Sequence, residues 1–89
     1  MFPFKMPKNT AVFSYTHIIN DGKPILYVTH DDENDWQFLC GDNHTIKDAM
    51  VIGIKEVFEM DKSIGILAKL PMRMTAEREN INVEWKINK

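Results

Sequence analysis

The side chains that could bind a metal ion are three histidines, one cysteine and a cluster of acids in the first half of the chain. Zinc sites in small domains usually place their ligands in pairs, two to five residues apart. The histidines, at positions 17, 30 and 44, are not spaced in this way. Residues 31–35 resemble the start of a calcium loop, but Trp36 stands where that loop needs glycine and Asp42 where it needs glutamate. We therefore predict no metal site and no cofactor.

The single cysteine, Cys40, is the side chain to consider as a nucleophile. It ends an apolar stretch in which Trp36 and Phe38 share its face at a period of two. An apolar environment disfavours the thiolate, so we predict a structural cysteine. His44 follows four residues later as a possible base. The alternative function is therefore a metal-dependent or accessory enzyme that uses His30, His44, Cys40 and the adjacent acids.

The acids are concentrated in one part of the chain. Between residues 21 and 43 there are six acids and one lysine, a net charge of −5, which leaves +3 on the remainder of a chain whose total is −2. A chain so nearly neutral lacks the basic excess that nucleic-acid binding usually needs, so we predict no nucleic-acid partner. The acidic cluster is either a solvated turn or a negative surface that steers a basic protein partner.

The second interpretation of this cluster defines a candidate partner-binding site. Its residues are Asp31, Asp32, Glu33, Asp35 and Trp36. Trp36 is expected to lie partly exposed there, as is Trp85, because exposed tryptophan beside acids is typical of a binding hot spot. Arg78 is added because its guanidinium could pair with one of these carboxylates.

Residues rich in β-branched and aromatic side chains predict three strands in the first half of the chain, at 10–19, 25–29 and 36–40. Asp21-Gly22 and Asn34-Asp35 favour turns between them. Because short connections favour antiparallel neighbours, we predict a meander of three strands with the second strand in the centre.

The second half of the chain mixes a short apolar run with helical spacing. Residues 49–54 predict a buried strand, and the apolar residues at 54–58 recur at the spacing of a short helix. Asp61 predicts the start of a second helix, which Leu70-Pro71 stops. We also expect a helical turn that begins at Thr75.

The C-terminal segment carries the clearest strand pattern, because the apolar residues at 81, 83, 85 and 87 alternate with polar ones. If the strand 81–87 lies at a sheet edge, it can pair with another chain, so a homodimer is a further hypothesis. The predicted fold class is α+β, an antiparallel sheet of the three-strand meander plus this C-terminal strand, with short helices packed on one face.

Length and composition predict one domain, since the chain has 89 residues, of which 44% are hydrophobic and 27% charged. We assign residues 10–89 to that domain and residues 1–9 to an N-terminal tail or edge segment, in which Pro3 and Pro7 interrupt the apolar residues. This interruption argues against a signal peptide. With one cysteine and no apolar run near the roughly 20 residues of a membrane helix, we predict a cytoplasmic protein without membrane contact.

Two stretches, 24–31 and 36–42, resemble a group of small, mostly bacterial proteins of unknown function that share P-x-L-Y-V-x-H-D followed by D-W-Q-F-L-C-G. Residues 61–64 and 70–78 are similar to the later D-P-S-L and L-P-x-G-x-x-A-x-R motifs, although Lys62 replaces the proline and residues 72–74 lack the glycine. Through a W-x-F-x-x-G-D strand the chain is also distantly similar to the immunity protein 33 family.

The resemblance covers about residues 10–86. The group of small bacterial proteins has no established activity, whereas the similarity to the immunity family implies a protein that binds and blocks a toxin domain. Neither resemblance supplies catalytic residues that could be assigned to this chain. Together with the acidic cluster, the similarity to the immunity family predicts a non-catalytic protein-binding domain whose acidic loop contacts a basic partner.

Overall fold

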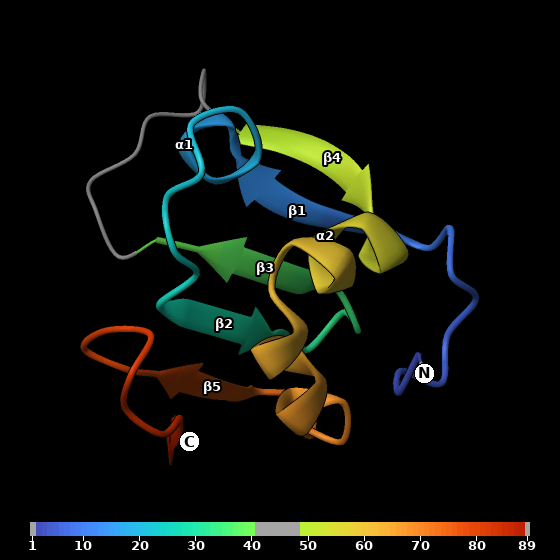
Figure 1. Cartoon of the computed structure of the whole chain (residues 1–89). Helices are drawn as coiled ribbons and strands as arrows, with labels where there is room; N and C mark the ends of the chain where they lie inside the picture. The colour runs from blue at the N-terminus through green and yellow to red at the C-terminus, as the bar shows by residue number, and fades with distance from the viewer. Residues whose placement is uncertain (1, 41–48, 89) are drawn as a thin grey trace.

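The computed structural model describes residues 2–40 and 49–88 of the chain. The strands of this part form one mixed sheet in the order β4-β1-β3-β2-β5-β6, and α2 and η2 lie across one of its faces (Figure 1). The strands are β1 (Ala11–Tyr15), β2 (Tyr27–His30), β3 (Trp36–Leu39), β4 (Ala49–Gly53), β5 (Met74–Glu77) and β6 (Lys86–Asn88). The helices are α1 (Thr16–Ile19), α2 (Ile54–Met60) and the 3-10 helix η2 (Lys62–Leu67). A mostly antiparallel sheet with short helices is the α+β content that the sequence predicts.

The first three strands do not form the predicted meander. β2 and β3 are an antiparallel hairpin, as expected. β1, however, pairs in parallel with β3, where Phe13 lies opposite Gln37, and pairs antiparallel with β4 on its other side. The cause is the connection between β1 and β2, which contains α1 and the loop 20–26 and is too long for a tight hairpin. β2 therefore lies between β3 and β5 and does not pair with β1.

The predicted strand 10–19 ends early because α1 occupies its second half. β1 stops at Tyr15, and Thr16–Ile19 form one helical turn. Ile18 of this turn is buried in the core, so its apolar character reflects burial and not strand pairing. Gly22 then adopts φ +71°, a left-handed conformation that favours glycine. The Asp21-Gly22 signal thus marks the loop after α1 and not a hairpin.

The core lies between one face of the sheet and the two helices α2 and η2. Alternation along the strands places a set of buried residues on this face: Val12, Ser14, Val28, His30, Trp36, Phe38 and Ala76. The helices contribute Ile54, Val57, Ile64 and Leu67 from the other side. The buried Ser14 hydroxyl donates to the Phe38 carbonyl oxygen at 2.9 Å, so this polar group is satisfied within the core.

The order of elements predicted between residues 49 and 67, a strand followed by two short helices, is confirmed. β4 lies where the strand 49–54 is predicted, and α2 begins at Ile54 as the apolar spacing indicates. The prediction that this strand is buried is wrong, because β4 is an edge strand whose residues are exposed or half-buried. Asp61 caps the next helix, since its side chain accepts a hydrogen bond from the Ser63 amide at 3.0 Å. That helix is the 3-10 helix η2, which ends before Leu70-Pro71. None of the helices in the described ranges is long and apolar enough to cross a membrane.

Two predictions for the C-terminal part are wrong. The expected helical turn from Thr75 is the strand β5, because residues 74–77 pair with β2 on one side and β6 on the other and bury Ala76. The predicted strand 81–87 pairs only at its end, as β6. Its first half is a loop in which Asn80 Oδ1 accepts a hydrogen bond from the Asn82 amide at 2.8 Å, before the chain returns along β5. In both places tertiary pairing overrides the local pattern.

The N-terminal segment contributes to the core. Phe4 is buried, and its ring meets that of Trp36 edge-on, with 5.5 Å between the centroids. The Lys8 carbonyl oxygen accepts a hydrogen bond from the Lys55 amide at 3.0 Å. Residues 2–8 therefore pack beside Trp36 and the start of α2, which is a closer association than a tail would have.

Candidate functional site

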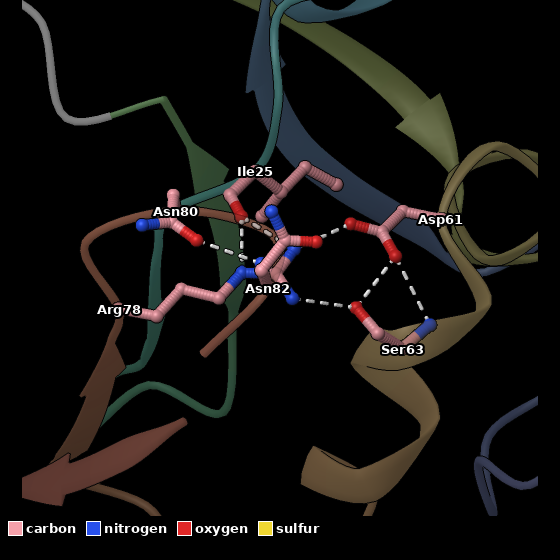
Figure 2. Close-up of polar contacts among 6 residues, drawn as sticks. All are labelled: Ile25, Asp61, Ser63, Arg78, Asn80 and Asn82. Atoms are coloured by element: carbon pink, nitrogen blue, oxygen red, sulfur yellow. Dashed lines mark hydrogen bonds and ion pairs between the residues drawn. The ribbon is translucent and has the colours of Figure 1, made fainter. Parts of the chain in front are cut away.

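Arg78 is a buried charged residue just after β5, with 3% of its side chain exposed. Figure 2 shows its guanidinium among oxygen acceptors. Nε and Nη2 both donate to the Ile25 carbonyl oxygen, at 3.1 and 2.9 Å, and Nη2 also donates to Asp61 Oδ2 at 2.7 Å. Nη1 donates to the Ser63 hydroxyl oxygen at 3.0 Å, and the guanidinium carbon lies 4.1 Å from the centre of the Trp85 ring. These contacts compensate the loss of water around a buried charge.

Asp61 and Ser63 also bond to each other. We call the resulting set of contacts the Arg78 network; it consists of Arg78, Asp61, Ser63, the Ile25 carbonyl and Trp85. The Ser63 hydroxyl donates to Asp61 Oδ1 at 2.6 Å while it accepts from Arg78. One carboxylate therefore both caps η2 and neutralises the guanidinium. The network fixes η2, the end of β5 and the chain before β2 relative to one another.

The predicted pairing of Arg78 with the acidic stretch is wrong. The Arg78 amide donates to the Leu26 carbonyl oxygen at 3.0 Å, which places Arg78 beside the start of β2. The acidic stretch follows His30, at the other end of that strand. The guanidinium is paired with Asp61 instead, at 2.7 Å. The sequence identifies the true partner, Asp61, only as a helix cap.

An apolar groove of about 380 Å³ lies beside the Arg78 network, between η2 and the C-terminal segment. Four exposed apolar side chains line it: Ile66, Ile81, Val83 and Ile87, with 78%, 63%, 43% and 51% of their surface exposed. They are half of the eight exposed large hydrophobic residues in the part of the chain that the structure describes. Such gathering of apolar side chains on a soluble domain is typical of a contact surface.

The Arg78 network holds the two sides of this groove in place. Arg78, Ser63 and Trp85 also line the groove, so its polar anchor and its apolar walls are contiguous. Ile66 is a wall residue that the sequence prediction misses. It lies off the face of η2 that Ile64 and Leu67 bury, and an apolar residue off the buried face is the available signal.

Trp85 is partly exposed, as predicted, but its indole nitrogen is not. Nε1 is shielded from solvent and has no hydrogen-bond partner among the described residues. A buried donor without an acceptor costs about 1–3 kcal/mol. The ring is held by its contact with the Arg78 guanidinium and by packing against the core, and this placement leaves the N–H without an acceptor among the described residues.

The acidic turn, residues 31–35, joins β2 to β3 and is organised by Asp31. Asp31 Oδ1 accepts hydrogen bonds from the backbone amides of Glu33 and Asp35, at 2.9 and 3.0 Å. The Asp31 amide in turn donates to the Asp35 carbonyl oxygen at 2.9 Å. Asp32 and Glu33 are exposed, whereas Asp31 and Asp35 are partly buried. The turn thus presents two freely exposed carboxylates and uses a third to hold its own shape.

Trp36 does not provide the exposed aromatic anchor that the sequence predicts, because only 5% of it is exposed. Its indole stacks on the His30 ring, with 4.1 Å between the centroids and 14° between the planes. His30 Nδ1 lies 2.6 Å from the Leu70 carbonyl oxygen, and Nε2 lies 2.6 Å from Asn34 Oδ1. Asn34 adopts φ +67°, which confirms the predicted change of direction at Asn34-Asp35. These contacts tie the hairpin to the segment after η2.

The described residues do not assemble the alternative enzymatic site. Cys40 is buried and follows β3, whereas His30 ends β2, so antiparallel pairing places the thiol and the imidazole at opposite ends of the hairpin. A nucleophile and its base need hydrogen-bond contact. His44 lies outside the described residues. Within residues 2–40 and 49–88, no group of three or more His, Cys, Asp or Glu side chains is arranged to hold a metal ion.

No protein-family model, curated protein or solved structure matches the chain. The groove, the Arg78 network and the acidic turn are therefore the features on which a functional proposal rests.

Proposed function

We propose that the chain is a small, non-catalytic protein-binding domain whose contact surface is the groove between η2 and β6. The observation that carries this proposal is the gathering of four exposed apolar side chains around one hollow, namely Ile66, Ile81, Val83 and Ile87. Full burial of such a side chain is favourable by about 1.5–3 kcal/mol, so a partner that covers several of them gains substantial affinity. The Arg78 network orders the groove before a partner arrives, which lowers the entropic cost of binding.

The acidic turn supplies the long-range part of this proposal. Asp32 and Glu33 are exposed at the tip of the hairpin, and the surrounding sequence from 21 to 43 carries −5. A negative surface raises the rate at which a basic partner approaches, without having to be the site of tight contact. The resemblance to the immunity protein 33 family favours one version of this role, in which the basic partner is a toxin domain that the chain blocks.

A pair of double variants tests the groove. Ile66→Ser with Ile87→Ser removes two apolar walls, and Phe13→Ser with Val51→Ser removes two exposed apolar side chains from neighbouring positions of β1 and β4. Each protein is immobilised and incubated with extract of the source organism, and retained proteins are compared by mass spectrometry. We expect a protein that the wild type and the β1/β4 variant retain but the groove variant loses.

Retention of the same proteins by all three forms, or of none by the wild type, contradicts the proposal. Circular dichroism and urea denaturation show whether both variants are folded, which keeps the comparison valid. A third variant, Asp32→Asn with Glu33→Gln, is expected to retain the partner but to bind it more slowly, with a weaker dependence of the association rate on salt.

A further inference from the structure

The edge of the sheet next to the groove is the strand β6. It pairs with β5 on one side, and no other described strand pairs with it. An edge strand presents backbone N–H and C=O groups on its free side, and an extended segment of another protein can add to them. The position of β6 therefore determines what kind of chain fits the groove.

Ile87 lies in the middle of β6, opposite Ala76 of β5. Ala76 is on the core face of the sheet, so Ile87 lies on the same face as η2 and its exposed Ile66. A strand added to β6 lies about 4.8 Å further out and directs every second side chain toward this face. Those side chains meet the groove, and the intervening ones face away from it. The occupant therefore has apolar residues at alternate positions.

The charged residues near β6 indicate which charge the bound segment should carry. A second hollow of about 590 Å³ adjoins the groove and is lined by Glu77, Glu79, Glu84 and Lys86, so three carboxylates face one ammonium group. Arg78 also reaches this hollow, but its charge is paired with Asp61. Glu77 lies opposite Lys86, the first residue of β6, so these carboxylates gather at that end of the strand. Lysine or arginine at the end of the occupant beside Lys86 complements this surface.

We infer that the groove binds an extended segment of a partner protein, with apolar residues at alternate positions and basic residues at the end beside Lys86, as an additional strand along β6. This inference rests on the proposed function and names the chemistry of the partner at that same surface. It also separates the two acidic regions, because the acidic turn acts on approach and the carboxylates near β6 act on the bound segment.

A selection from a phage library of short random peptides on the immobilised full chain tests this inference. We expect the wild type and the β1/β4 variant to enrich peptides with alternating apolar residues and a basic residue at one end, and the Ile66→Ser, Ile87→Ser variant to lose them. For the best synthetic peptide, the groove variant should raise Kd by about tenfold or more. N-methylation of alternate backbone nitrogens on the peptide should abolish binding, because it removes the donors that pair with β6.

Three results would overturn the inference. These are no enrichment above the groove variant, enrichment of peptides without a basic residue at either end, and unchanged binding of the N-methylated peptide. Light scattering supplies the fourth test, since a dimer of the wild type that the groove variant dissociates would make a second copy the occupant. If peptides fail while the captured partner still depends on Ile66 and Ile87, this inference is wrong and the proposed function stands.

Discussion

The charged residues at the two ends of β2 lie in opposite environments. At its C-terminal end, the acidic turn exposes Asp32 and Glu33, and Asp31 bonds to backbone amides only two and four residues away. At its N-terminal end, the charge of Arg78 is buried, and its partners lie 15, 17 and 53 residues away in sequence. Beside Arg78 the surface has an apolar groove on one side and a carboxylate-lined hollow on the other.

This contrast indicates which end is shaped by the fold as a whole. The acidic turn is built from neighbouring residues and needs little more than the hairpin to form. The groove depends on contacts among η2, β5 and the C-terminal segment, so its shape exists only in the folded domain. Ordered apolar surface that long-range contacts hold in place is a feature of binding sites, whereas locally ordered charge is common on any soluble surface.

Replacing Arg78 should have the largest effect on stability. Arg78→Ala leaves Asp61 and the Ile25 carbonyl without their donor, and loss of one partner of a buried pair costs about 3–5 kcal/mol. That is a large share of the roughly 5–13 kcal/mol expected for a domain of this size. Urea denaturation measures the loss, and Arg78→Lys should recover part of it, because lysine keeps the charge without the planar fork.

The matched control for Arg78 is Lys55→Ala, an exposed lysine in α2. It should change the free energy of unfolding by no more than about 0.5 kcal/mol. An equally small change for Arg78→Ala would show that the network contributes little to the fold, and the contrast between the two ends of β2 would then be one of appearance only.

Changes in the acidic turn should have an intermediate effect that depends on the position. Asp31→Ala removes the acceptor of two backbone amides and should destabilise the domain by about 1–2 kcal/mol. Asp32→Ala, one residue further along and exposed, should stay within about 0.5 kcal/mol of the wild type. Thermal unfolding of both proteins under one buffer condition is sufficient. Equal losses for the two variants would mean that Asp31 does not organise the turn.

Trp85→Phe should have the smallest effect of the three. It removes the indole N–H that lacks a partner among the described residues, which favours the variant, and weakens the contact with the Arg78 guanidinium, which opposes it. The net change in the free energy of unfolding should be within about 1 kcal/mol. A loss of more than about 2 kcal/mol in urea denaturation would imply that the indole donates a hydrogen bond after all.

Local sequence signals predict the local parts of this fold. The Asn34-Asp35 turn, the Asp61 cap and the β4–α2 boundary each depend on residues close together in the chain. The parallel pairing of β1 with β3 could not be predicted in this way, because no feature of either strand specifies the partner. The helical turn predicted at residues 75–79 is wrong for the same reason. Pairing with β2 and β6 imposes an extended conformation on a sequence with helical propensity.

The candidate site was predictable only in part. Arg78 is the basic residue that the sequence singles out. Its partner is Asp61 because β5 ends beside the start of β2, away from the acidic turn. The predicted exposure of Trp36 is wrong. Alternation in β3 places Trp36 on the same face as Phe38, but it does not reveal that Phe4 and His30 cover that face. The alternation at 81–87 predicts a strand with one apolar face, but residues 81–85 form a loop that leaves Ile81 and Val83 exposed, and these residues line the groove.

The place of β1 in the sheet has a consequence for the synthesis of the chain. Phe13 pairs with Gln37 and Val51, which the ribosome adds much later. At about 5–20 residues per second, β1 waits for some 2–8 seconds before β4 is made. The β2–β3 hairpin, by contrast, can close within about 1–10 microseconds once both strands have emerged. We therefore expect the hairpin to be the first part of the nascent sheet, and the apolar side chains of β1 to be the segment that molecular chaperones meet while it lacks both neighbours.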